Sequence, residues 1–306
     1  MILIGENIHV ISKKVREALI NRDEIFVKNL LNFQKKMDYF DLNVGPARGD
    51  LENVLSWLSS IVEQNFLQKI SLDTTNFFEM KNAISNLKKS DNIFLNSVGF
   101  DEEKLDKMIS LSLENNANLI ALTMSKEIGI PKTSDGRLEI AFQIYEKCLE
   151  MGLEAEKIFF DPLVLPIKVD QSQALESLNT LKMIKESFDP PVKTVIGLSN
   201  VSNGVPVEFR SLINRVYGVM AFGAGLDAVI MDAGDDELVR VFRMLEKKSP
   251  EKNIDNLYLS IADMVSRFGE LDDVEFDESD EEECQVIKTC EILLNKKIYS
   301  DSFAIV

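Results

Sequence analysis

Eight short apolar runs recur along this 306-residue chain, and their spacing constrains the fold more than any other feature. Their first residues lie about 32 residues apart, which is the size of one strand–helix unit. The runs occupy residues 2–5, 39–44, 70–74, 93–98, 119–124, 158–164, 194–198 and 228–231. Eight alternating strand and helix signals favour a closed (β/α)8 TIM barrel of the α/β class over an open doubly wound sheet.

The segments between the runs show helical periodicity. One predicted helical face consists of Phe26, Leu30, Phe33 and Met37. A second follows Asp101, a predicted N-cap, and consists of Leu105, Met108, Ile109 and Leu113. After the last run, helices are predicted at 237–247 and 286–295. We expect residues 1–306 to form one barrel domain with an insertion at about 249–283. Within the insertion we expect a helix at 253–268 and then a solvated, dispensable acidic loop at 270–283.

Charge and composition exclude several classes of protein. The net charge of −17 argues against nucleic-acid binding, which depends on Lys and Arg. No basic leader or long apolar segment follows Met1, so we expect neither secretion nor a membrane span. Cys148, Cys284 and Cys290 contain no C-x-x-C pair and are expected to be free thiols in a reducing cytoplasm. With His9 as the one histidine, we expect no metal site.

Polar side chains follow nearly every apolar run. The stretch 193–206 is the clearest case, because its apolar run ends in Ser-Asn and a polar loop. The corresponding residues of the other runs include Glu6, Asn7, Asp41, Asn43, Asp73, Asn96, Asp161 and Asp232. In a parallel barrel these ends meet at one mouth, where ligands bind, although any single residue could instead cap a helix. Carboxylates and amides without cations suit a ring with an amidine-like edge, such as a pterin.

Six short motifs occur in the order found in one family. They are Gly-Glu-Asn-Ile at 5–8, Asp-Leu-Asn-Val-Gly-Pro at 41–46, Leu-Asp-Thr-Thr-Asn at 72–76, Leu-Thr-Met at 122–124, Asp-Pro-Leu-Val-Leu-Pro at 161–166 and Gly-Leu-Ser-Asn-Val-Ser at 197–202. Together they resemble the methyltetrahydrofolate:corrinoid protein methyltransferases of the pterin-binding barrel superfamily. The superfamily also includes dihydropteroate synthase and the folate module of cobalamin-dependent methionine synthase. The resemblance covers residues 1 to about 237 and resumes at 291–295 and 299–303.

The resemblance implies roles for particular residues. Asp73, Asn96 and Asp161 would hold the pterin, and Asn200 would lie near N5, with Asn200 and Asp161 as catalytic residues. The other residues expected to contact the substrate are Glu6, Asp41, Asn43, Gly197, Ser199 and, at the mouth, Arg210. The family commonly has Arg and Asn where this chain has Asn7 and His9, so neither is assigned a function.

The implied reaction moves the methyl group of methyltetrahydrofolate reversibly between N5 and the Co(I) of a corrinoid. A separate corrinoid protein would carry that cofactor, because the chain lacks Asp-x-His-x-x-Gly, the usual cobalamin motif. We also expect a homodimer. Two alternatives remain at this stage. One is a dihydropteroate synthase-like pterin enzyme, although that family typically has a Gly-x-Ser-Arg-Lys-type motif where this chain has Gly-Leu-Ser-Asn at 197–200. The other is a non-catalytic folate-binding protein.

Overall fold

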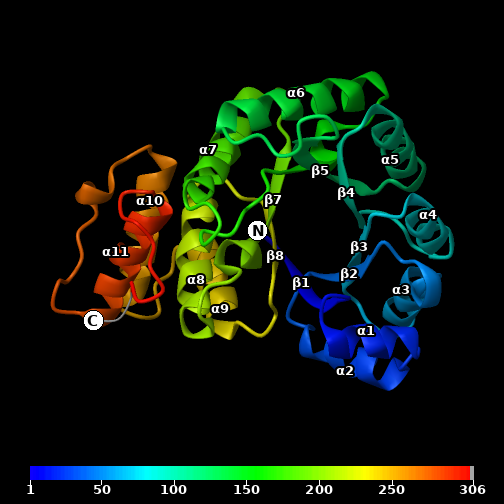
Figure 1. The fold of residues 1–306 in the computed structure, drawn as a ribbon, viewed down its shortest axis with the longest axis horizontal. Helices are drawn as coiled ribbons and strands as arrows, with labels where there is room; N and C mark the ends of the chain where they lie inside the picture. The colour runs from blue at the N-terminus through cyan, green and yellow to red at the C-terminus, as the bar shows by residue number, and fades with distance from the viewer. Residues whose placement is uncertain (304–306) are drawn as a thin grey trace.

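The computed structural model describes residues 1–303, and within them eight parallel strands close into a barrel in sequence order (Figure 1). The strands are β1 (Ile2–His9), β2 (Tyr39–Gly45), β3 (Lys69–Thr74), β4 (Phe94–Phe100), β5 (Asn118–Ser125), β6 (Ile158–Asp161), β7 (Lys193–Gly197) and β8 (Ala228–Met231). Pairing of β1 with β8 closes the ring. The predicted TIM barrel is therefore confirmed, and each predicted apolar run contains a strand. The sixth run was predicted too long, because β6 ends at Asp161.

The barrel has an apolar interior. Its buried apolar side chains come from all strands except β3, and they are Ile4, Tyr39, Phe94, Ile120, Phe159, Val195, Ala228 and Ile230. Phe94 packs between Tyr39 and Phe159, with ring centroids 4.9 and 4.7 Å away. Alternate residues of each strand face the outer helices and form the larger apolar layer there. A filled interior leaves the strand ends as the surface on which a site can form.

The helices that follow the first seven strands surround the barrel. They are α1 (Lys13–Ile20), α2 (Glu24–Phe33), α3 (Val54–Asn65), α4 (Phe77–Ser85), α5 (Glu102–Asn115), α6 (Ser134–Glu150), α7 (Ser172–Ser187) and α8 (Val207–Gly223). The predicted cap of α5 is confirmed, since the Asp101 carboxylate accepts from the Lys104 N–H at 3.4 Å. The predicted face of α2 is correct only in part: Phe26 and Leu30 pack half-buried against the core, but Val27 and Leu31 are the fully buried residues of the helix and Phe33 is 53% exposed.

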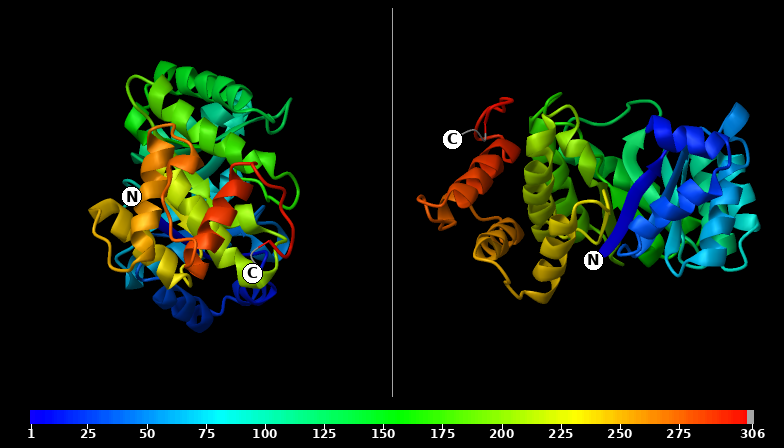
Figure 2. Two further views of the ribbon diagram at one scale, coloured as in Figure 1. Left: turned by 90° about the vertical axis from the view of Figure 1, so that its left-hand side faces the viewer. Right: turned by 90° about the horizontal axis from the view of Figure 1, so that it is seen from below.

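The chain after β8 completes the ring with α9 and then adds two helices outside it. It contains α9 (Asp236–Lys247), α10 (Ile254–Ser266) and α11 (Glu281–Leu293), and Figures 1 and 2 show α10 and α11 beside α8. The α8 and α10 backbones approach closely at Gly223, where an added Cβ would overlap the carbonyl group of Ala262. Glycine is therefore required at this crossing.

The prediction of a solvated loop at 270–283 is wrong in two respects. Leu271 and Val274 are only 6% and 8% exposed and pack in the same apolar cluster as α8 and α10. Helix α11 also begins earlier than predicted, because the Asp280 carboxylate accepts from the N–H groups of Glu282 and Glu283. Acidic residues in a first helical turn are favoured by the helix dipole, so part of the acidic run has a helical role.

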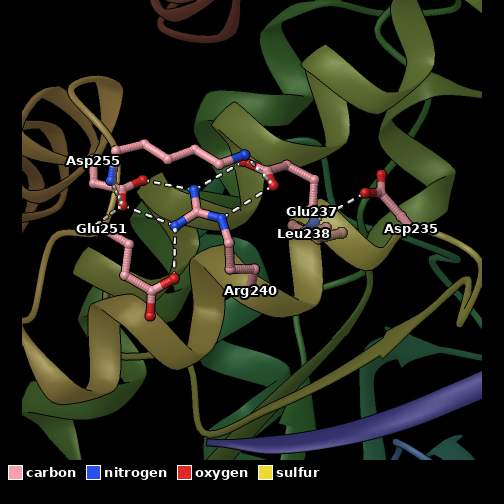
Figure 3. A network of polar contacts seen from close by, with 7 residues as sticks. Asp235, Glu237, Leu238, Arg240, Glu251 and Asp255 are labelled. Carbon is pink, nitrogen blue, oxygen red and sulfur yellow. Dashed lines mark hydrogen bonds and ion pairs between the residues drawn. The ribbon is translucent and has the colours of Figure 1, made fainter.

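A charged network joins α9 to α10 (Figure 3). The Arg240 guanidinium binds the Asp255 carboxylate at 2.7 and 2.8 Å and the Glu237 carboxylate at 2.8 and 3.0 Å. Backbone N–H groups of Glu251 and Lys252 also donate to Asp255, whose side chain is fully buried. Hydrogen bonding to Arg240 lowers the pKa of Glu237 to about 2. Burial opposes the same change at Asp255, but its hydrogen bonds still lower the pKa to about 2.

No helix in the described part of the chain is long and apolar enough to cross a bilayer.

Candidate active site

The predicted polar residues lie at the carboxyl ends of the barrel strands. Asp41 and Asp73 occupy neighbouring strands, β2 and β3, and their carboxyl groups are hydrogen-bonded to each other. Burial raises the pKa of both groups, and the neighbouring Asp41 carboxylate raises that of Asp73 well above its ordinary value. Two carboxyl groups this close do not both ionise easily, so protonation of the pair is favoured, and it is favoured more at Asp73, whose pKa is raised further.

Amide and hydroxyl groups surround this carboxyl pair. Ser71 Oγ and Asn96 Nδ2 both donate to one oxygen of Asp41, at 2.6 and 3.2 Å. Asn43 Nδ2 donates to Asp73 at 2.5 Å. Three adjacent strands, β2, β3 and β4, thus form one hydrogen-bonded group.

Asp161 ends β6 and is nearly buried, with 9% of its surface exposed. Burial raises its pKa to about 7, against the opposing effects of a hydrogen bond from the Leu163 N–H at 2.7 Å and of the Arg137 charge. At neutral pH Asp161 therefore exists in both protonated and ionised forms.

Arg137 lies on α6 and is completely buried. Its Nε donates to the Pro131 carbonyl group and its Nη2 donates to Gln173 Oε1 at 2.6 Å. Its Nη1 has no hydrogen-bond partner among the described residues. Burial lowers the pKa of the guanidinium, and the nearby acidic groups that oppose this effect include Asp161. Arg137 therefore provides a positive charge beneath the mouth.

Glu6 and Ser199 connect two strands that are not neighbours. Ser199, just after β7, donates from Oγ to Glu6 Oε1 on β1 at 2.5 Å. Burial raises the pKa of Glu6 to about 7; the Ser199 hydrogen bond opposes this change, and the Asp41 and Asp232 charges add to it. Glu6 is thus a second carboxyl group that holds a proton in part at neutral pH.

Asn200 lies at the exposed rim of the mouth, in a 3-10 turn (Leu198–Ser202) that follows β7. Its Oδ1 accepts from Asn203 Nδ2 at 3.2 Å. Its Nδ2 lies over Gly197, 3.0 Å from the position that a Cβ would occupy there. The missing side chain at Gly197 leaves the space in which the Asn200 amide lies.

Comparison with known proteins identifies the family. The family model described as pterin binding enzyme matches residues 43–232, which is more than half of the chain. The chain belongs to the pterin-binding enzyme family. The predicted resemblance to this superfamily is confirmed. Within the matched residues lie Asn43, Asp73, Asn96, Asp161 and Asn200.

Two sequence relatives of this pterin-binding enzyme each align with 76% of the chain. A protein of Eubacterium limosum named methylcorrinoid:tetrahydrofolate methyltransferase is 26% identical over 236 residues, covering 76% of this chain and 85% of that protein. Methionine synthase of Mycobacterium tuberculosis is 26% identical over 246 residues. The aligned region spans 76% of this chain and only 20% of that much longer protein.

Solved structures with the same fold include two dihydropteroate synthases. That of Xanthomonas albilineans, solved with 4-aminobenzoic acid, has a TM-score of 0.58 and 14% identity and covers 81% of this chain and 93% of its own. That of Coxiella burnetii, in complex with pteroic acid, has a TM-score of 0.54 and 15% identity, with 73% and 87% covered. At these identities the likeness extends to the fold alone.

The structure of the pterin-binding enzyme brings most predicted site residues to one mouth, but within the described residues Arg210 makes no hydrogen bond or ion pair with the carboxyl groups there. Arg210 lies in the first turn of α8, is exposed, and donates from Nε to the Val205 carbonyl group at 2.7 Å. Asn7, which was left without a function, donates to Asp232 at 2.6 Å and so connects β1 to the end of β8.

Sequence reasoning missed Ser71 and Arg137. Ser71 lies two residues before Asp73 on β3, so strand alternation could have placed it on the same side of the strand. Arg137 had no comparable signal, because an arginine within a helical segment is usually exposed.

Proposed function

We propose that this pterin-binding enzyme transfers the N5-methyl group of methyltetrahydrofolate to the Co(I) of a separate corrinoid protein, and catalyses the reverse transfer. The observation that carries this proposal is the group of carboxyl and amide side chains at the barrel mouth. Its acceptors are complementary to the N–H groups of a pterin edge. The name of the E. limosum relative supports the proposal, since the aligned region spans 85% of that protein.

Asp161, Asp73 and Asn96 are proposed to bind the pterin. One oxygen of Asp161 accepts from the Leu163 N–H, and its carboxylate has further acceptor capacity for pterin N–H groups. Because the pKa of Asp161 is about 7 without a ligand, N–H donors would favour its ionised form. Asn96 and the Asp41–Asp73 pair would offer both donors and acceptors to the rest of the ring. Asn43, Glu6, Ser199 and Gly197 would hold these groups or shape the pocket.

Methyl transfer from N5 requires that the amine be a good leaving group, and protonation of N5 provides this. Burial raises the pKa of several carboxyl groups at the mouth: that of Glu6 and Asp161 to about 7, and that of Asp73 well above its ordinary value. We propose that these groups supply the proton, directly or through water. The Asn200 amide oxygen would then accept a hydrogen bond from the N5–H that forms.

The corrinoid is the methyl acceptor and would be presented by the partner protein, whose Co(I) is a strong nucleophile. Asn200 is exposed at the rim, which is compatible with an approach from outside the barrel. We further propose a homodimer located in the cytoplasm. The three cysteines are free thiols, and two of them, Cys148 and Cys290, are buried.

The decisive experiment measures methyl transfer in both directions with purified protein. Methyltetrahydrofolate is mixed with Co(I)-cobalamin, and methylcobalamin is mixed with tetrahydrofolate, while cobalt oxidation and methylation are followed by absorbance. We expect transfer well above the protein-free control in both directions. If the protein binds folate but transfers no methyl group to or from free cobalamin or corrinoid proteins, it is instead a folate-binding protein. Condensation of p-aminobenzoate with a pterin diphosphate would indicate a dihydropteroate synthase, although Ser199-Asn200 follows β7 here in place of a basic pair.

A further inference from the structure

The loop between β6 and α7, residues 162–171, is bound by a segment that follows the barrel, residues 292–301 (the C-terminal segment). The connection is made by the Gln171 side chain, at the end of the loop. Its Nε2 donates to three oxygen atoms, which are the Ile292 carbonyl oxygen at 3.0 Å, Asn295 Oδ1 at 3.1 Å and the Lys297 carbonyl oxygen at 2.6 Å. Its Oε1 accepts from the Tyr299 N–H at 2.6 Å. These partners follow Gln171 by 121 to 128 positions, so folding of the whole chain is needed to bring them together.

Lys168 makes a second contact between the same two segments. Its Nζ binds both carboxylate oxygens of Asp301, at 2.9 and 3.0 Å. Its aliphatic chain lies over Gly204, with Cδ 3.4 Å from the position that a Cβ would occupy there. Both charged side chains are about half exposed, so the ion pair adds little stability by itself. Gln171, with its four contacts, is therefore the main connection between the segments.

The same loop is hydrogen-bonded to the turn that carries Asn200. The Ile167 N–H donates to the Val201 carbonyl group at 3.1 Å, and Val201 directly follows Asn200 in that turn. The side chains of Ile167 and Val201 are both buried in the apolar cluster that also contains residues of α8 and α10. Residues 166–170 form a compact turn, because the Pro166 carbonyl group accepts from two N–H groups of that turn, at 2.9 and 3.2 Å. A contact at the end of the loop therefore reaches Asn200 through bonded groups.

Asp161 is held in a different way, at the beginning of the loop. It belongs to β6, and its carboxylate accepts from the Leu163 N–H at 2.7 Å. The contacts made by Lys168 and Gln171 lie further along the chain. Their loss should therefore displace Asn200 more than Asp161.

We propose that Gln171 is a positioning residue for methyl transfer: it holds the loop at 162–171 against the C-terminal segment and, through the Ile167–Val201 hydrogen bond, fixes the turn that carries Asn200. The inference rests on the proposed function, in which the Asn200 amide acts at N5. Gln171 thus acts on the reaction through Asn200 and not by contact with the folate. The sequence motifs at 291–295 and 299–303 then have a role, because they supply partners of Gln171.

The variant Gln171→Met keeps a side chain of similar length but removes its donors and its acceptor. We expect single-turnover methyl transfer to Co(I)-cobalamin, at saturating methyltetrahydrofolate, to be about tenfold slower, since a small displacement of a reacting group has an effect of this order or larger. The affinity for methyltetrahydrofolate, measured by equilibrium titration, should change much less. Gln171→Glu should slow the transfer at least as much, because its carboxylate would face the three oxygen atoms that accept from Gln171.

Two control variants separate this effect from a general loss of stability. Gln68→Met is the same substitution at a glutamine that donates to the Lys35 carbonyl group at 2.7 Å, just before β3 at the opposite end of the barrel. Leu271→Ala removes a buried side chain from the chain outside the ring and leaves the loop at 162–171 unaltered. Both controls should transfer the methyl group at the wild-type rate below their melting temperatures.

Hydrogen exchange, followed by mass spectrometry without substrate, tests the connection independently. Peptides from 162–171 and 198–206 should exchange faster in Gln171→Met than in the wild type, and as in the wild type in both controls. A wild-type transfer rate in Gln171→Met, unchanged exchange in that variant, or an equal loss of rate in the controls would overturn the inference alone. Absence of transfer by the unmodified protein would overturn it together with the proposed function.

Discussion

The Glu6 carboxylate on β1 accepts a hydrogen bond from Ser199, which follows β7, across the intervening β8. The two residues are 193 positions apart in the chain, so the contact exists only because the barrel closes. The contact also affects the pKa of Glu6: burial raises this pKa, and the hydrogen bond from the hydroxyl group opposes part of the rise.

Ser199→Ala should raise the pKa of Glu6 above its value of about 7, because it removes the hydrogen bond that stabilises the ionised form. If Glu6 holds the proton used at N5, the limb of the pH–rate profile at which activity falls with rising pH should move to higher pH. Single-turnover rates between pH 5 and 9 measure this. Ser199→Thr keeps the hydroxyl group and should retain the original profile; identical profiles for all three proteins would contradict a role for Glu6.

Asp161→Asn should weaken methyltetrahydrofolate binding by roughly 2–4 kcal/mol, the scale of a lost charge-assisted hydrogen-bonded pair. Asp73→Asn should have a smaller effect, because the raised pKa of Asp73 favours its protonated form and an amide resembles a protonated carboxyl group. Calorimetry compares both with Asp232→Asn, which alters an exposed carboxylate at the end of β8. Unchanged affinity in both Asp161→Asn and Asp73→Asn would rule out the proposed placement of the pterin.

Asn200→Ala should lower the rate of methyl transfer by about two orders of magnitude, comparable to losing one preorganised hydrogen-bonding group in other enzymes. The affinity for methyltetrahydrofolate should decrease much less, because the N5–H that Asn200 binds develops mainly in the transition state. Single-turnover transfer to Co(I)-cobalamin and equilibrium titration separate the two quantities. A variant with the wild-type rate would leave Asn200 as a structural residue of the turn.

Arg240→Met should lower the free energy of unfolding by about 3 kcal/mol at pH 7, because it leaves the buried Asp255 carboxylate without its charged partner. The pKa values of Glu237 and Asp255 are lowered to about 2, below the value of about 4 in unfolded chains. The contribution of these two ionised carboxylates to the stability of the protein is therefore complete above about pH 4 and disappears as the pH falls towards 2.

Chemical denaturation at pH 7 and pH 3 measures this contribution. The difference in the free energy of unfolding between wild type and Arg240→Met should be smaller at pH 3 than at pH 7. Arg267→Met breaks an exposed ion pair on α10 and should change little at either pH. An equal loss of stability at both pH values would exclude the ionic origin.

Leu271→Ala should destabilise the protein by about 2–3 kcal/mol, since it removes a buried side chain from the layer between the acidic segment and α10. Thermal unfolding should show a clear fall in Tm. The matched control Leu67→Ala changes a side chain that is 99% exposed and should have almost no effect. Equal Tm values for wild type and Leu271→Ala would restore the view of 270–283 as a dispensable loop.

The barrel was predictable because each strand is a short apolar run that can be recognised locally, and because these runs follow one another at a spacing typical of strand–helix units. The face of α2 was predictable only in part, because the neighbouring helices and strands bury Val27 and Leu31 more deeply than the predicted Phe26 and Leu30. The acidic segment was misjudged because the three apolar residues among its ten carboxylates, Leu271, Val274 and Phe276, pack against the apolar cluster of α8 and α10.

The candidate site, like the fold, was predictable from the sequence only in part. Strand ends predicted which residues reach the mouth, but not which of them touch. The Asp41–Asp73 contact depends on the register of β2 against β3, in which Asn43 rather than Asp41 lies opposite Asp73. The Glu6–Ser199 contact depends on closure of the whole barrel. The burial of Arg137 depends on how α6 packs against α7, and no local pattern in the sequence records it.

The close crossing of α8 and α10 at Gly223 also limits how this protein can assemble with others. With α10 and α11 already lying on α8, the outer side of that helix is occupied by the chain itself (Figure 2). A protein that approaches the molecule from this side therefore meets α10 and α11 instead of α8, so a binding surface there would be built from the chain that follows the barrel and not from the barrel helices.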